Sequence, residues 1–304
     1  MSIIFGVINF PGRKVAETEL KALAEATQRY APDGTFLYAD NNLGMGFQPY
    51  YTHERSSLES QPVADNLGNR IVFDGRLDNH ADLAAELQLR VPRTQDSLIL
   101  LAAFERWGEQ CFSRLIGDWA LALWSAGDRT LYLARDPAGS RTLYYHTADG
   151  VFRWSTYLET FFADNERHPL NCEWATRFLC GHPVGDLTPY QGISAVPPSH
   201  FHAIKDARVS QSKRWEWIPE HRVCHKSDAD YEEHFLELFQ QAVVRRTGTG
   251  APILAELSGG MDSTSIVCMS DHIRKLSDKK ESELLDTVSY WEASEPNWDE
   301  KPFF

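Results

Sequence analysis

The sequence predicts a fold in two parts, an α+β sandwich of antiparallel sheets followed by the start of an α/β domain with parallel strands. Two observations predict the sandwich: short β-branched and aromatic runs are separated by turn residues, and stretches with apolar residues at helical spacing lie between them. A third observation predicts the second part. A strand, a glycine-rich loop, a helix and another strand follow one another near the C-terminal end.

The first elements are read from short-range patterns. Residues 3–9 (IIFGVIN) form a short β-branched run, and at this length such a run favours a buried strand over a helix. A helix is predicted over 15–29, because apolar side chains recur at helical spacing and Pro32-Asp33-Gly34 marks its end. Strand-like pieces follow at 35–39, 44–50 and 70–73.

A second helix and a meander are expected next. After Asp96, apolar residues at positions 100, 103, 104 and 107 occupy one helix face. Four strand patterns follow, and Gly127-Asp128, Pro137 to Gly139 and Asp149-Gly150 supply the turns between them. The four strands are expected at 120–124, 130–134, 142–146 and 151–155.

The domains are expected at 1–206 and 227–304, joined by a polar and aromatic strap over 207–226. The second domain begins with an amphipathic helix around 231–242, and a strand is expected at 252–257. The loop 258–263, a helix and a strand at 285–291 complete it. A single β-loop-α-β unit cannot cover a parallel sheet on both faces. We therefore expect this domain to be incomplete and the sequence to be a C-terminally truncated piece of a longer chain.

Composition excludes several classes of protein. The chain has 304 residues with 30 Lys plus Arg against 43 Asp plus Glu, a net charge of −13 that disfavours nucleic acid and anionic membrane surfaces as partners. No apolar stretch is long enough to cross a bilayer, and the N-terminal residues lack the pattern of a secretory signal, so a cytoplasmic location is expected. The five cysteines contain no C-x-x-C pair, which fits neither a disulfide framework nor a zinc ribbon.

The loop between the predicted strand and helix of the second domain carries the chemistry. Gly259 and Gly260 allow a tight turn that brings backbone N–H groups toward one point, where the following helix N-terminus adds partial positive charge. Ser258 and Ser263 can add hydroxyl donors. Asp262 would repel phosphate unless a divalent cation lay between them, so magnesium pyrophosphate resolves the conflict. The alternative is a glycine-rich turn with a capping Ser and no ligand.

The string S-G-G-x-D-S after a strand is similar to the pyrophosphate-binding loop of the ATP pyrophosphatases, and it lacks the Lys of a Walker loop. Along the whole chain the sequence resembles the asparagine synthetase family. The resemblance is carried by IIFGV at the start and by 30–34, 74–79, 135–139, 143–145, 192–193, 197–198 and 258–263. It implies an N-terminal-nucleophile (class II glutaminase-like) amidotransferase sandwich, followed by an adenylating domain of the PP-loop, adenine-nucleotide α-hydrolase-like type.

The sequence departs from this family where glutamine would be hydrolysed. The family carries Cys after the initiator Met, and Ser2 stands there; Ser can act as nucleophile once Met is removed. The family's Asn-Gly-Glu segment is Asp74-Gly75-Arg76 here. The resemblance assigns the Asn to oxyanion stabilisation and the Glu to the α-ammonium of glutamine, so Asp74 and Arg76 invert the chemistry. Asp96 matches an ammonium-binding Asp, or it only caps its helix.

These departures imply an inactive glutaminase half, as in the lasso-peptide macrolactam cyclases and β-lactam synthetases of the family. The resemblance then implies an ATP- and Mg²⁺-dependent, AMP-forming ligase that joins the carboxylate and the amine of a small molecule or peptide. Mg²⁺ would be held through Asp262. The residues expected to bind ATP and pyrophosphate are Leu257, Ser258, Gly259, Gly260, Asp262, Ser263, Ser289 and Tyr290.

Two alternatives stay open at this point. One is a glutamine-hydrolysing asparagine synthase that uses Ser2 as nucleophile. The other is a truncated, non-catalytic chain that packs against a partner protein. A homodimer is a possible assembly in either case.

Overall fold

The computed structural model describes residues 1–10, 12–89, 94–163, 167–182, 185–247, 252–276 and 285–290. The chain divides into two compact units, Met1–Trp217 and Ile218–Phe304. No helix in the described ranges has an apolar stretch long enough to cross a membrane.

The first unit contains two six-stranded sheets in which every pairing is antiparallel. The first sheet has the order β10-β8-β9-β1-β3-β2 and the second the order β12-β11-β7-β6-β5-β4. The strands of the first sheet are β1 (Ile3–Asn9), β2 (Phe36–Asp40), β3 (Leu43–Gln48), β8 (Tyr144–Ala148), β9 (Val151–Ser155) and β10 (Ile193–Ala195). Those of the second are β4 (Val63–Ala64), β5 (Arg70–Leu77), β6 (Gly117–Ser125), β7 (Thr130–Arg135), β11 (His200–Lys205) and β12 (Arg208–Lys213).

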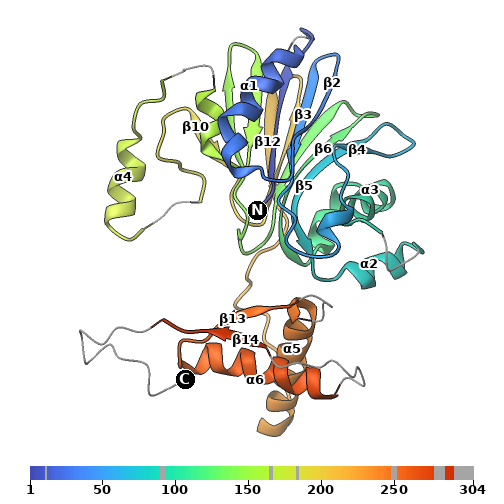
Figure 1. Ribbon diagram of the computed structural model, residues 1–304, viewed down its shortest axis with the longest axis vertical. Helices are drawn as coiled ribbons and strands as arrows, with labels where there is room; N and C mark the ends of the chain where they lie inside the picture. Colours follow the sequence, from blue (N-terminus) through green and yellow to red (C-terminus); the bar gives the residue numbers. More distant parts are fainter. Residues whose placement is uncertain are drawn as a thin grey trace. The chain divides into compact units, whose positions relative to one another are not determined.

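Three apolar cores hold the layers together. Ile4 and Ile8 of β1 lie in the core between the two sheets, whereas Ile3, Phe5 and Val7 point to the other face of the same sheet. This alternation follows from the period of two along a strand. The outer face of the first sheet is covered by α1 (Glu17–Thr27), and α2 (His80–Glu86) and α3 (Asp96–Trp107) cover the second sheet (Figure 1).

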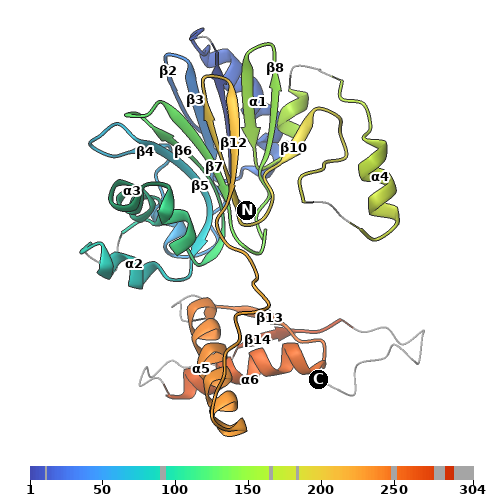
Figure 2. The same ribbon diagram turned by 180° about the vertical axis from the view of Figure 1, so that it is seen from behind.

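Shorter elements connect these layers. In the described part of this unit, 3-10 helices lie at Gln28–Tyr30, Ser56–Leu58, Gly108–Arg114 and Leu158–Phe162. Helix α4 (Cys172–Leu179) stands away from the sandwich in both views (Figures 1 and 2).

The predicted α+β sandwich is confirmed, and several element boundaries differ from those expected. The strand at 3–9 is confirmed as β1. The strand expected at 70–73 continues to Leu77, so the segment 74–76 lies inside β5 rather than in a loop. The strap expected at 207–226 begins instead as β12, which pairs with β11, and the first unit extends to Trp217. The polar sequence of β12 concealed this edge strand because neither of its faces is buried. Helices α2 and α4 were not expected.

The second unit contains α5 (Asp228–Thr247), β13 (Leu254–Glu256), α6 (Met261–Leu276) and β14 (Asp286–Val288). β13 and β14 pair in parallel, with Leu254 opposite Asp286. The β-loop-α-β unit is therefore confirmed. Trp291, expected at the end of the last strand, lies outside the described residues.

Candidate functional site

The fold brings Ser2 and Asp74 together at the start of β1. The Ser2 hydroxyl accepts a hydrogen bond from the Tyr50 backbone N–H at 3.1 Å, and the Ser2 backbone N–H donates to the Asp74 carboxylate. Asp74 comes from β5 in the other sheet and is only 3% exposed. The predicted nucleophile position and the first residue of the predicted glutamine-binding segment thus adjoin each other.

Asp74 is an unusual buried acid because its carboxylate is poorly compensated. Among the described residues, no hydrogen bond reaches its Oδ2. The Arg141 Nε lies 4.0 Å from that oxygen, and the N-terminal amine adds a second positive charge nearby. Burial outweighs both and raises the pKa of Asp74 from 3.8 to about 6. At neutral pH a negative charge, rather than an amide donor, therefore lies beside Ser2.

Gly75 is required by the sheet itself. Its φ is +142°, a conformation that disfavours any side chain. A Cβ there would lie 2.1 Å from the Asp118 backbone oxygen, because Gly75 stands opposite Trp119 in the β5–β6 ladder. The presence of this glycine is thus explained without a bound glutamine.

The carboxylate of Asp96 already has partners within the chain. Its Oδ2 accepts a hydrogen bond from the Leu77 backbone N–H at 2.9 Å, and its Oδ1 lies 3.3 Å from Arg55 Nε. Arg55 also donates to the Leu77 carbonyl at 2.8 Å, which fixes its position. The alternative that Asp96 only caps α3 is wrong: the N-cap residue is Gln95, and the Asp96 carboxylate reaches across to β5.

The inverted charge at Arg76 also has a partner within the chain. Arg76 Nε donates to Asp78 Oδ1 at 3.0 Å. The side chains of Arg55, Arg76 and Asp96 are each in ion pairs. A charged amino acid entering here would have to displace these contacts.

Arg55 and Arg141 face the buried acids Asp96 and Asp74, and neither residue was predicted from the sequence. Each comes from a loop remote in sequence from the acid that it faces. No local pattern marks such residues, because their relation to Asp96 and Asp74 depends on how the sheets pack.

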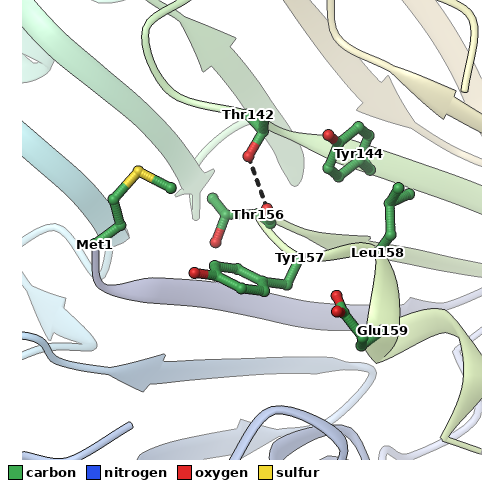
Figure 3. Close-up of a pocket in the computed structure, with 7 residues that line it drawn as sticks. All are labelled: Met1, Thr142, Tyr144, Thr156, Tyr157, Leu158 and Glu159. Carbon is green, nitrogen blue, oxygen red and sulfur yellow. Dashed lines mark hydrogen bonds between the residues drawn. The ribbon is translucent and has the colours of Figure 1, made fainter. Parts of the chain in front are cut away.

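A cavity of about 250 Å³ lies next to the N-terminus. It is lined by Met1, Thr142, Tyr144, Thr156, Tyr157, Leu158 and Glu159, and Figure 3 shows the Thr142 hydroxyl bonded to the Thr156 carbonyl at its wall. Asp74, Gly75, Arg76 and Asp96 do not line it. The segment 74–76 therefore does not form the wall of this cavity, although the charge of Asp74 acts on both Met1 and Tyr157, which do.

In the second unit, the loop after β13 has the shape expected of an anion-binding turn. Gly259 adopts φ +77°, and α6 begins at Met261 directly after the turn. The Ser258 and Ser263 hydroxyls lie 3.0 Å apart, and the Ser258 backbone N–H donates to the Ser263 hydroxyl at 3.2 Å. The Gly260 N–H makes only a long bond to the Ser258 hydroxyl, 3.4 Å. The N–H groups of Ser258 and Gly260 thus donate to serine hydroxyls, and an oxygen of a bound phosphate can take the place of these acceptors.

The donor set of this loop suits a magnesium-bound phosphate. The first N–H groups of α6 have no partner within the helix, which favours an anion at this end. Asp262 lies in the first turn of α6 and is exposed, so its carboxylate is available to a cation. Oxygen ligands of this kind are those Mg²⁺ prefers.

The end of β14 lies beside the same loop. Leu257 donates its backbone N–H to the Val288 carbonyl at 2.9 Å, and the Ser289 hydroxyl donates to the Leu257 carbonyl at 2.6 Å. Tyr290 follows with 73% of its side chain exposed. The structure thus brings Leu257 and Ser289 together at the carboxyl end of two parallel strands, where open α/β sheets bind ligands.

Comparisons with known proteins agree with this organisation. Residues 1–216 match the model of the glutamine amidotransferase domain, and residues 234–298 match that of asparagine synthase. The amidase chry2 of Gibberella zeae is 26% identical over 88% of this chain and 41% of its own length. Asparagine synthetase [glutamine-hydrolyzing] 3 of Bacillus subtilis is 25% identical over 88% of this chain and 45% of its own length. The chain thus spans less than half the length of these curated relatives.

Solved structures show the same fold at low identity. Glutamine phosphoribosylpyrophosphate amidotransferase from B. subtilis matches with a TM-score of 0.52 and 12% identity, covering 94% of this chain and 65% of that one. The similarity of the two structures thereby supports the predicted fold class. The chain belongs to the asparagine synthetase family: residues 1–216 form its glutamine amidotransferase domain, and residues 234–298 match its asparagine synthase domain.

Proposed function

We propose that this chain belongs to an ATP-dependent, AMP-forming amide synthetase. The observation that carries the proposal is the loop 258–263, which joins β13 to the N-terminus of α6 beside the parallel strand β14. A carboxylate oxygen of the substrate would attack the α-phosphorus of ATP and break its bond to the bridging oxygen, releasing pyrophosphate. An amine would then attack the acyl carbon, lose a proton and release AMP.

The residues of the loop would act mainly on the leaving group. The backbone N–H groups after Gly259 and the hydroxyls of Ser258 and Ser263 would hold pyrophosphate oxygens as charge develops on them. Asp262 would bind Mg²⁺, which neutralises part of that charge when bound. Leu257, Ser289 and Tyr290 would flank the nucleotide, since they lie at the carboxyl ends of β13 and β14.

We propose further that the amidotransferase domain does not release ammonia from glutamine. Asp74 places a negative charge beside Ser2 where an oxyanion would need a hydrogen-bond donor, and loss of one such donor costs about 3 kcal/mol in related chemistry. Arg55 neutralises Asp96, the carboxylate that matches the ammonium-binding residue. The amine consumed in the second step would then come from the substrate, a small molecule or peptide, in the cytoplasm where ATP is present.

The purified chain is expected to release no glutamate from glutamine above the uncatalysed rate. The physical reason is the carboxylate of Asp74 beside Ser2, so the Ser2→Ala variant is expected to behave like the parent. A coupled glutamate dehydrogenase assay measures the release. Glutamate production that disappears in Ser2→Ala would instead establish a glutamine-hydrolysing synthase with Ser2 as nucleophile.

The Asp262→Asn variant is expected to weaken binding of magnesium pyrophosphate by about tenfold or more, because a neutral amide is a poor Mg²⁺ ligand. Isothermal titration of the chain with pyrophosphate, in the presence and absence of Mg²⁺, measures the effect. Asp228→Asn is the matched control, since Asp228 also lies in the first turn of a helix but follows no glycine turn. Equal losses in both variants, or Mg²⁺-independent binding, would remove Asp262 from the site.

A further inference from the structure

The cavity next to the N-terminus combines aromatic walls with a carboxylate. Tyr144 lies on β8, and Tyr157 and Glu159 follow β9, which pairs with β8. Figure 3 shows the two rings and the carboxylate around the same space. The cavity volume of about 250 Å³ lies below the range of about 300 to 1,000 Å³ that is typical for drug-sized ligands, so a molecule of amino-acid size or smaller fits.

The carboxylate of Glu159 has only weak contacts within the chain. Among the described residues, two groups approach it, the Tyr30 hydroxyl at 3.5 Å and the Arg29 guanidinium at 3.8 Å. No hydrogen bond from a described residue reaches its Oε2. The side chains of Arg29 and Glu159 are 68% and 44% exposed, and an ion pair this long and this exposed contributes little to stability. A positively charged ligand can therefore approach Glu159 without breaking a strong contact.

The charges around the cavity favour a cation over an anion. Burial raises the pKa of Tyr157, and the negative charges of Asp74 and Glu159 raise it further, whereas the opposing effect of Arg141 is weaker. The electrostatic potential that the charged side chains create at this ring is therefore negative. An anion would be repelled there, and a cation would be attracted.

The positive groups near the cavity are each compensated. Arg141 Nε lies 4.0 Å from Asp74 Oδ2, and Arg135 interacts electrostatically with the neighbouring carboxylate of Asp136. Burial lowers the pKa of the Met1 α-amine, so this amine carries less positive charge than an exposed one. None of these groups therefore cancels the attraction of Glu159 for a second positive charge.

We propose that this cavity binds a primary alkylammonium ion, with the ammonium group between the rings of Tyr144 and Tyr157 and hydrogen-bonded to Glu159. The faces of aromatic rings attract cations. The Tyr157 hydroxyl has no hydrogen-bond partner among the described residues and can accept a bond from the ammonium. Met1 and Leu158 provide apolar walls for the carbon chain. The two rings and the carboxylate come from other parts of the unit, so they stay in place if Met1 is removed.

A free amine and the lysine side chain of a peptide share this chemistry. The site lies wholly within the first unit, and its test uses neither ATP nor glutamine. The proposal is therefore independent of the proposed function of the chain, and either can fail without the other.

Ligand titration followed by NMR tests the chemical class on the full chain at neutral pH. n-Pentylamine is expected to bind with a Kd of about 1 mM or lower. 1-Pentanol and hexanoate, a neutral and an anionic molecule of similar length, are expected to bind about tenfold more weakly or not at all. Nα-acetyl-lysine N-methylamide separates the two sources: binding equal to that of pentylamine indicates a lysine side chain, and weaker binding indicates a free amine. Pentanol or hexanoate binding as tightly as pentylamine, or no binding of pentylamine, overturns the proposal.

The Glu159→Gln variant tests the role of the carboxylate. Pentylamine is expected to bind about tenfold more weakly or worse, because a hydrogen bond between two charged groups is lost, and the weak binding of pentanol is expected to stay unchanged. Tyr157→Leu is expected to weaken pentylamine binding about threefold through the lost cation–π contact. Glu173→Gln is the matched control, since Glu173 is also in an exposed ion pair, with Arg177, but does not line the cavity. Urea unfolding checks that each variant is folded. Unchanged binding of pentylamine to a folded Glu159→Gln variant contradicts the proposal.

Discussion

Asp74→Asn is expected to raise the free energy of unfolding of the first unit by about 3 kcal/mol at pH 8. The reason is the pKa of Asp74, which burial raises from 3.8 to about 6 in the folded chain. One pKa unit corresponds to about 1.4 kcal/mol, so keeping this acid ionised inside the fold carries a cost of that size. Asparagine has nearly the same shape and no charge to bury.

The pH dependence follows from the sign of this shift. A raised pKa means that the folded state holds the proton more tightly than the unfolded state. The contribution of Asp74 to stability is therefore fully present below pH 3.8 and is lost as the pH rises through about 6. The difference between Asp74→Asn and the parent should be close to zero at pH 3.5 and fully developed by pH 7 to 8. Urea unfolding followed by fluorescence of buried Trp119 and Trp154 measures it.

Asp136 supplies the matched control for this prediction. It is equally buried, but its carboxylate accepts hydrogen bonds from the backbone N–H groups of Ser140 at 3.0 Å and Arg141 at 3.2 Å. Asp136→Asn is expected to destabilise the unit by about 1 to 3 kcal/mol, because it replaces an acceptor that donors surround. If both substitutions destabilise, the Asp74 charge is better compensated than its geometry indicates, and the explanation for an inactive glutaminase half loses its main support.

Gly75→Ala is expected to destabilise the first unit by about 4 kcal/mol. The added Cβ would lie 2.1 Å from the Asp118 backbone oxygen and 2.7 Å from the Trp119 Cα. Both are backbone atoms of β6, so they can move only if the ladder opens. The φ of +142° adds conformational strain, and each of the two effects costs about 1 to 3 kcal/mol.

Gly108→Ala separates the two contributions. Gly108 also has a positive φ, +56°, at the end of α3, but no atom lies within 4 Å of the position of an added Cβ. The cost there is expected to be about 1 to 3 kcal/mol, from backbone conformation alone, because φ +56° combined with ψ −144° is a conformation that few residues other than glycine adopt. Thermal or urea unfolding of both variants measures the difference. Equal costs would mean that β6 yields to the extra methyl group, and Gly75 would then need another explanation.

Together these two predictions change how the 74–76 segment is interpreted. From sequence the segment is interpreted as the remains of a glutamine pocket, with a negative charge added at Asp74 and a charge inverted at Arg76. In the structure Gly75 allows the close approach of β5 and β6, and Arg76 forms an ion pair with Asp78. Asp74 is the departure from the family that has a chemical consequence. An aspartate in place of the family's asparagine puts a negative charge next to Ser2.

Elements whose signals are local could be predicted from the amino-acid sequence. The β-branched run at 3–9, the helix after Asp96 and the strand-loop-helix around Gly259 were all predicted correctly, because period and turn chemistry act over a few residues. For the 258–263 loop the sequence also predicts a chemistry, since its donors are neighbours along the chain, and this chemistry stays a prediction.

Contacts between residues that are distant in the chain could not be predicted in this way, because they depend on how the sheets pack. That Arg55 faces Asp96, that Arg141 faces Asp74, and that Asp74 lies beside Ser2 all depend on the register and packing of two sheets. The pKa of Asp74 likewise reflects burial, which no local pattern encodes. Electrostatic interactions and close packing depend on the positions of all strands at once. They could therefore be identified only in the three-dimensional structure.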